Sequence, residues 1–245
     1  MVLTAHQPVY LPWFGLFHKI ALADVFCFLE DVQYQRSDWN NRNKVKFSNG
    51  KPDWLSVPVL KKDFLERSYM DICIDNKDTW RRKHWFSIEL NYCKSPYFGR
   101  YRDELKAVYD REWEFLVDLN YEMLLLFLRW LKIPTKIVRM RDYSFKGKKS
   151  DLVLDMCRQL GADIYIFGAQ GKDYADISSF HQSRIVPYFQ EYKHPIYPQI
   201  HGDFVSHLAV IDLLLNCGEA SYDILMSGNI TRSELELWSS SQLAS

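Results

Sequence analysis

The sequence has no excess of charge of either sign. Its 245 residues include 31 Lys and Arg and 31 Asp and Glu, so the formal net charge is zero. A general binder of nucleic acid or of an anionic membrane shows a basic surface, and this balance argues against both classes. We therefore expect no nucleic-acid partner, and we expect phosphate to be bound only where a few cations gather.

Cysteines are few and are not arranged for a disulfide framework. The five are odd in number and widely spaced, with no CxxC pair, which is typical of reduced thiols in a cytoplasmic protein. Three histidines, His194, His201 and His207, lie close in the sequence, but spacings of seven and six residues are poor for metal ligands. We predict a cytoplasmic protein without a metal site.

Long hydrophobic runs are also absent. The most apolar stretch, "MLLLFLRWL", is too short to span a bilayer and contains an arginine. The first residues lack a basic segment, and Pro8 and Pro12 interrupt their apolar stretch, so we expect no signal peptide.

Hydrophobic residues make up 47% of the chain and aromatics 16%, enough for a sizeable core. We expect a single α/β domain over residues 1–230 with a helical segment at about 77–131. The polar residues 231–245 read as a flexible tail.

Local patterns predict the order of the elements. A buried strand at 2–5, a helix at 12–23 and the apolar run "DVFCFLED" form a β-α-β unit, and Asn49-Gly50 joins two strand-like runs as a hairpin. A second β-α-β unit runs from "PTKIVRMRDY" to "IYIFG". These patterns predict a mostly parallel sheet flanked by helices, with a helical insertion.

Two turns that directly follow predicted strands are candidates for a binding site. Ligands of open parallel sheets bind beyond the carboxyl ends of the strands, which is where "HQPVYLPW" and "GAQGKDY" would lie. In the first, His6, Lys19 and the start of the helix suit a phosphate. The alternative is that His6 and Gln7 only satisfy backbone groups of a proline-rich turn.

Further polar residues follow the second and later strands. Arg42 stands between Asn41 and Asn43, downstream of Asp31, and offers a planar fork to phosphate or carboxylate. Gly168 and Gly171 allow close backbone approach, and Lys172 adds charge, although this is no Walker motif and a plain turn has the same spacing.

Several separated blocks of the chain resemble the WbqC-like family of bacterial surface-polysaccharide gene clusters. They are "HQPVYLPWFGLFHKI", "DVQYQRSDWNNRNKVK", "GAQGKDY" and "HPIYPQIHGDFVSHLAVIDLLLNCG". The resemblance implies work on nucleotide-linked sugars. A weaker similarity to nucleotidyltransferase-like, Rossmann-like proteins implies ATP binding at the first turn, but "HQPVY" departs from their HxGH motif and no clear KMSKS follows.

From these features we expect an acyl- or aminoacyltransferase that forms an amide on the amine of a nucleotide-linked amino sugar, in O-antigen or related glycan assembly. The partners would be that sugar and an acyl donor, which the sequence leaves open between an ATP-activated donor, a thioester and another donor. Open alternatives to this function are glycosyl or nucleotidyl transfer in the same pathway and a non-catalytic protein that binds the nucleotide sugar. A homo-oligomer is also open.

The expected catalytic residues are His6, Lys19 and His194, with His6 or His194 as the base for the amine. The expected substrate contacts are Gln7, Tyr10, Trp13, Asp31, Asn41, Arg42, Asn43, Gly168, Gly171, Lys172, Tyr174, Tyr197 and Gln199.

Overall fold

The computed structural model describes residues 1–35, 38–60 and 66–243. Its centre is a five-stranded sheet in the order β5-β2-β1-β6-β7, in which every neighbouring pair is parallel. The strands are β1 (Val2–His6), β2 (Val25–Phe28), β5 (Lys136–Arg139), β6 (Ile164–Phe167) and β7 (Val186–Phe189). The predicted α/β fold with a mostly parallel sheet is confirmed, while the nucleotidyltransferase-like or Rossmann-like detail stays a prediction.

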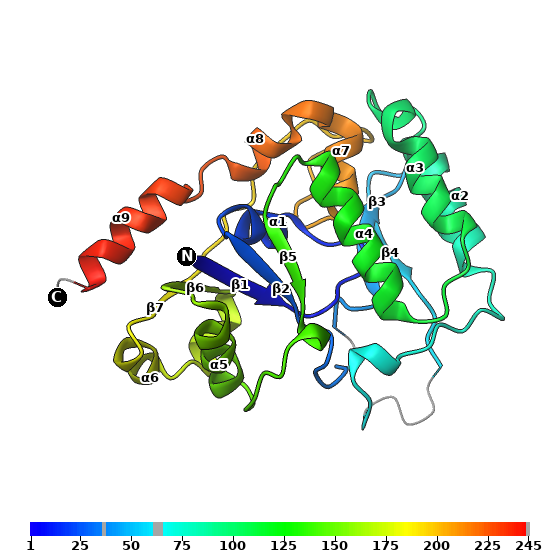
Figure 1. The fold of residues 1–245 in the computed structure, drawn as a ribbon. Helices are drawn as coiled ribbons and strands as arrows, with labels where there is room; N and C mark the ends of the chain where they lie inside the picture. Colours follow the sequence, from blue (N-terminus) through cyan, green and yellow to red (C-terminus); the bar gives the residue numbers. More distant parts are fainter. Residues whose placement is uncertain (36–37, 61–65, 244–245) are drawn as a thin grey trace.

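Helices cover both faces of this sheet (Figure 1). Alternate strand residues such as Ala5 and Cys27 pack with α5 (Ser150–Leu160) and α6 (Ile177–Gln182) on one face. Phe26 and Phe28 point to the other face, which is covered by α1 (Phe14–Ala21) and α4 (Leu116–Trp130). The continuous apolar runs of the strands follow from this burial on both sides.

The segment between β2 and β5 carries the predicted insertions. A hairpin of β3 (Arg42–Lys46) and β4 (Pro52–Ser56) pairs in antiparallel register, as the Asn-Gly turn predicts. The helices α2 (Trp80–Tyr92), α3 (Phe98–Asp110) and α4 follow and lie together at the right of Figure 1. Short 3-10 turns complete the described chain at Tyr69–Asp71, Met140–Asp142, Ala169–Asp173 (η4) and Gly218–Ala220.

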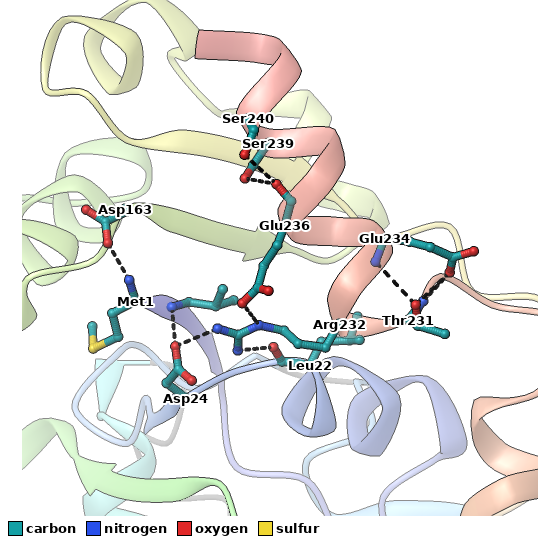
Figure 2. Close-up of polar contacts among 11 residues, drawn as sticks. Met1, Leu22, Asp24, Asp163, Thr231, Arg232, Glu234, Glu236, Ser239 and Ser240 are labelled. Atoms are coloured by element: carbon teal, nitrogen blue, oxygen red, sulfur yellow. Dashed lines mark hydrogen bonds and ion pairs between the residues drawn. The ribbon is translucent and has the colours of Figure 1, made fainter.

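The C-terminal residues differ from the flexible tail that their polarity predicts. After α7 (Val210–Cys217) and α8 (Ser221–Met226), the chain forms α9 (Arg232–Leu243), and Leu235 is fully buried against β1, β6 and β7. Figure 2 shows Arg232 bonded to the carbonyl of Leu22 and to Asp24, which ties α9 to the amino-terminal side of the sheet. A helix with one fully buried leucine has little apolar periodicity, so its packing was not visible in the sequence.

The strand order changes direction at one place in the five-stranded sheet. From β1 the chain moves outward to β2 and β5, and it then returns to place β6 and β7 on the other side of β1. At such a switch point the loops of neighbouring strands separate, and ligands of α/β proteins bind there, beyond the carboxyl ends. Here the switch point lies between β1 and β6. Across the described residues, no helix is both long and apolar enough to cross a membrane.

Candidate functional site

The carboxyl ends of three strands form one row of residues. His6 pairs with Phe28, and Phe28 pairs with Arg139. Since neighbouring strands are ~4.8 Å apart, His6 and Arg139 lie about 10 Å apart across the row. On the other side of β1, Thr4 pairs with Ile166, so the turn that begins at Gly168 leaves the sheet beside His6. The turns after β1 and β6 therefore meet at the switch point.

The half-buried His6 and the buried Lys19 lie together at the end of β1. Lys19 is 3% exposed, and its Nζ donates to the carbonyl oxygen of Ala5 at 3.0 Å. Burial lowers the pKa of Lys19 to about 7. Burial, and then the charge of Lys19, lower the pKa of His6 to about 3. The imidazole of His6 is therefore neutral at physiological pH, with a buried amine beside it.

The hydrogen bond of His6 fixes its tautomer. Its Nδ1 lies 2.8 Å from the carbonyl oxygen of Gln7, and because a carbonyl only accepts, Nδ1 carries the proton. The Nε2 atom is then the acceptor, which is the form a general base needs. Lys19 differs from expectation, because its ammonium is buried against β1 and does not meet a phosphate directly. Any role of Lys19 passes through its charge.

The hairpin lies against the first turn, as the interleaved aromatics show. The backbone N–H of Tyr10 donates to the carbonyl of Trp39. The half-buried ring of Trp13 lies 5.3 Å from His6 and 6.0 Å from Trp39, measured between ring centroids. Arg42 extends the contact, with its guanidinium 4.7 Å from the ring centroid of Trp54. Residues from "HQPVYLPW" and "WNNRN" thus share one surface.

Other predicted contacts are buried and serve the fold. Tyr10 is fully buried, with its hydroxyl 2.8 Å from His84 Nδ1 and 2.7 Å from the Tyr109 hydroxyl. Asn43 is likewise fully buried and bonds to the carbonyl of Leu11. Both side chains are closed off inside the protein, and a substrate contact by either one stays a prediction.

Two later predicted residues also belong to an internal network. Tyr197 is 4% exposed and donates to the buried carboxylate of Asp212 at 2.7 Å. The amide of Gln199 donates to the Tyr197 hydroxyl, and its oxygen accepts from Lys46. Tyr197 is therefore also closed off inside the protein, its contact with substrate stays a prediction, and Gln199 orders the loop that carries it. Asn41 plays a similar local part by donating to the carbonyl of Val57.

In the turn after β6, close packing against the core requires a glycine at position 171. A Cβ at Gly171 would lie 2.5 Å from Cβ of Phe167, so any side chain there collides with the core. This explains Gly171 without a phosphate, whereas Gly168 has open space around it. Lys172 is exposed and pairs with Glu191 at 2.6 Å, and Tyr174 is 41% exposed. The cation of this turn is thus partly neutralised.

The side chain of His194 packs beside Phe14, the first residue of α1. Its ring centroid is 4.5 Å from that of Phe14 and 5.2 Å from that of His207. Its Nδ1 lies 2.9 Å from the carbonyl oxygen of Pro195 and so donates, while Nε2 is buried with no hydrogen-bond partner among the described residues. Burial lowers the pKa of His194. The His-Pro segment therefore reaches the same end of α1 as Trp13.

A buried ion-pair cluster at the end of β2 and β5 was missed in the sequence. Glu30 is fully buried and accepts three hydrogen bonds from Nε and Nη2 of Arg139 and one from Arg141 at 2.7 Å. The two arginines are partly exposed, at 21% and 34% of their side chains. The sequence signal that could have indicated this cluster is the pair of arginines in "RMR", at the end of a predicted strand. Asp31, a predicted contact, follows Glu30 and is exposed.

Only Gln7 among the predicted residues borders a described cavity. A hole of about 10 Å³ lies against Gln7, Phe28 and Asn120, and Gln7 Oε1 also accepts from the Tyr69 hydroxyl. A hollow of about 380 Å³ lies elsewhere, between Arg100 and Tyr222. A cleft common to His6, Arg42, Lys172 and His194 stays a prediction.

Comparisons with known proteins agree on one family. The model of the WbqC-like protein family matches residues 7–224, which include the first turn, the hairpin and the His-Pro segment. The uncharacterized protein Rv1507c of Mycobacterium tuberculosis is 32% identical over 221 residues, which cover 89% of this chain and 95% of that relative. No solved structure matches the chain.

Proposed function

The chain belongs to the WbqC-like protein family, and from that membership we propose that it is an enzyme that acylates or aminoacylates the amine of a nucleotide-linked amino sugar. Its setting would be the assembly of a bacterial surface polysaccharide, as the resemblance of its sequence implies. The observation that carries the proposal is the neutral imidazole of His6 at the switch point of the sheet, with its Nε2 free of the tautomeric proton.

An amide forms when the neutral amine attacks the acyl carbon. The new C–N bond forms, the bond from the acyl carbon to its phosphate or thiolate leaving group breaks, and one N–H proton leaves the amine. His6 Nε2 is placed to take that proton. Its low pKa makes it a weak base in the free protein, but the negative charge of a bound diphosphate would raise this pKa and strengthen the base.

Cations at the same edge would hold the phosphate groups of the acyl donor. Arg139 and Arg141 stand at the end of β5, in the row that begins at His6, where both pair with Glu30 and Arg139 also lies 3.9 Å from Asp118, and both side chains stay partly exposed. Planar guanidinium groups bind phosphate oxygens in pairs. These arginines, rather than the buried Lys19, are the stronger candidates for such contacts.

The test is a direct assay of amide formation. The purified chain is incubated with uridine or thymidine diphosphate-linked amino sugars and with either acetyl-coenzyme A or an amino acid plus ATP. Mass spectrometry then detects the added acyl mass. We expect product only from the amino sugar, not from the matched hydroxy sugar, and a loss of turnover of about a hundredfold or more in His6→Gln.

His181→Gln is the matched control, since His181 is exposed on α6. It should retain full turnover. Full turnover by His6→Gln would contradict the proposed role of His6. Binding of the sugar nucleotide without product from any donor would favour the non-catalytic alternative.

A further inference from the structure

Three tryptophans form a continuous row on the surface beside His6. Trp13 precedes α1, Trp39 precedes β3, and Trp54 lies in β4. The ring centroids are 6.0 Å apart from Trp13 to Trp39 and 5.3 Å apart from Trp39 to Trp54. We call these three residues the tryptophan row. It begins at the carboxyl edge of the sheet and ends on the hairpin.

Buried backbone bonds hold the row in place. The segment of Trp39 is bonded to the first turn through Tyr10, and Trp13 forms a β-bridge with Ala209. The Ala209 N–H in turn donates to the carbonyl of Lys44 in β3 at 2.9 Å. The first turn, the hairpin and the residue before α7 are thus tied together by backbone bonds, and this connected backbone carries the three rings.

The outer end of the row is both exposed and cationic. Trp54 is 38% exposed, and the Arg42 guanidinium and Lys44 ammonium lie 4.7 Å and 4.9 Å from its ring centroid. Lys44 is the direct cross-strand partner of Trp54, while Asn43 and Leu55 face the core on the other side of the hairpin. Alternation along the strands therefore collects the two cations and the ring on the outward face.

We propose that the tryptophan row and its two cations bind the nucleoside diphosphate half of a sugar nucleotide. The base would stack on Trp54 at the exposed end of the row, the diphosphate would meet Arg42 and Lys44 beside it, and the sugar would extend along Trp39 and Trp13 towards His6. Aromatic side chains stack on any base, and guanidinium groups pair with phosphate oxygens. This assignment rests on the proposed function, whose reacting amine it places at the His6 end.

The test uses nucleoside diphosphates alone. Uridine, thymidine and guanosine diphosphates are titrated into the purified chain by calorimetry, and the tryptophan fluorescence is followed in parallel. We expect at least one of them to bind. Trp54→Leu should weaken that binding about tenfold or more, Trp54→Phe should restore most of it, and Arg42→Gln with Lys44→Gln should weaken it and lessen its salt dependence.

Trp238→Leu is the matched control. Trp238 is a half-buried tryptophan of α9 that packs on Tyr188 of β7, and it is not part of the tryptophan row. It should bind as the parent does, and melting curves check that each variant is folded. Absence of binding by all three diphosphates, or affinity unchanged in Trp54→Leu, would overturn the assignment. So would Trp54-dependent binding of the free amino sugar in place of the diphosphate.

These outcomes separate the site from the reaction. If His6→Gln abolishes acyl transfer while Trp54→Leu leaves the affinity for the diphosphate unchanged, the proposed function stands and this assignment fails. If diphosphate affinity depends on Trp54 while no donor yields product, the assignment stands and the proposed function fails.

Discussion

The Nζ atom of Lys19 lies 3.0 Å from the carbonyl oxygen of Ala5, the residue that precedes His6. This bond brings the buried amine of Lys19 from α1 to the carboxyl end of β1. There its positive charge lowers the pKa of the neighbouring His6 imidazole. The pair makes two properties of the site depend on pH, namely the charge at the edge of the sheet and the basicity of His6.

We expect Lys19→Met to remove a rise in stability above neutral pH. The pKa of Lys19 is about 7 in the folded state and 10.5 in the unfolded chain, so between these values the unfolded state binds more protons. The free energy of unfolding should then increase with pH, by up to ~1.4 kcal/mol per unit. Urea unfolding at pH 7, 8 and 9 measures the slope, which the variant should lack.

Lys83→Met is the control for this comparison, because the Lys83 side chain is 63% exposed. It should keep the slope of the parent. Equal slopes in the parent and Lys19→Met would show that the buried amine does not titrate in this range.

Acid should destabilise the protein through its buried histidines. Burial lowers the pKa of His18 and of His84 to about 4, against 6.5 in the unfolded chain. As the pH falls from 6.5 towards 4, the unfolded state takes up these protons first, and stability is lost by up to ~1.4 kcal/mol per unit for each group. Urea unfolding between pH 7 and 4 should show a smaller loss in His84→Gln, and an unchanged loss in the exposed His181→Gln. A parent whose stability is constant over this range would contradict the expectation.

Glu30→Gln should destabilise the fold far more than removal of an exposed pair. Glu30 is fully buried between Arg139 and Arg141, so the neutral amide removes their buried carboxylate and leaves the more exposed Asp118, 3.9 Å from Arg139, beside them. Loss of one partner of a buried pair costs about 3 kcal/mol or more, whereas an exposed pair contributes under ~1 kcal/mol. Chemical denaturation of Glu30→Gln and of Glu104→Gln, whose partner Arg129 is exposed, tests the difference. Similar losses in the two variants would show that the buried cluster relaxes easily.

Leu235→Ala should reveal that α9 is part of the folded domain. Leu235 is fully buried, whereas Leu237 on the same helix is 74% exposed. Truncation of a buried leucine costs about 2–4 kcal/mol, and an exposed one changes stability by no more than ~0.5 kcal/mol. Unfolding curves of Leu235→Ala and Leu237→Ala measure both. A Leu235→Ala variant as stable as the parent would restore the expectation of a flexible tail.

The sheet was predictable because its signals are local. Apolar runs with turn residues at their ends mark β1, β2 and β6, and Asn49-Gly50 marks the hairpin, each within a few residues of sequence. The edge of the sheet that carries His6 follows from the same signals, since parallel strands direct their following turns to one side. Short stretches of sequence were therefore enough to predict these strands, the hairpin and the edge of the sheet.

Burial of individual polar groups was not predictable, because it depends on distant parts of the chain. The hydroxyl of Tyr10 meets His84 and Tyr109, 74 and 99 positions away. Arg139 finds Glu30 across 109 positions. No local pattern states whether a turn residue faces solvent or a helix that follows much later. The sequence therefore located the edge of the site but not which of its side chains are open to a ligand.

Tyr10→Phe tests that distinction directly. The sequence places Tyr10 in the candidate turn as a substrate contact, and the structure places its hydroxyl inside, between His84 and Tyr109. Removing the hydroxyl leaves two buried polar groups short of a partner, which costs about 1–3 kcal/mol. Because the side chain is 0% exposed, affinity for a sugar nucleotide and turnover should match the parent at a temperature where both proteins are folded. Unfolding curves and calorimetric titration of the same preparation give both numbers. A Tyr10→Phe protein of parental stability but weakened affinity would return Tyr10 to the site, and would mean that the first turn opens when the ligand binds.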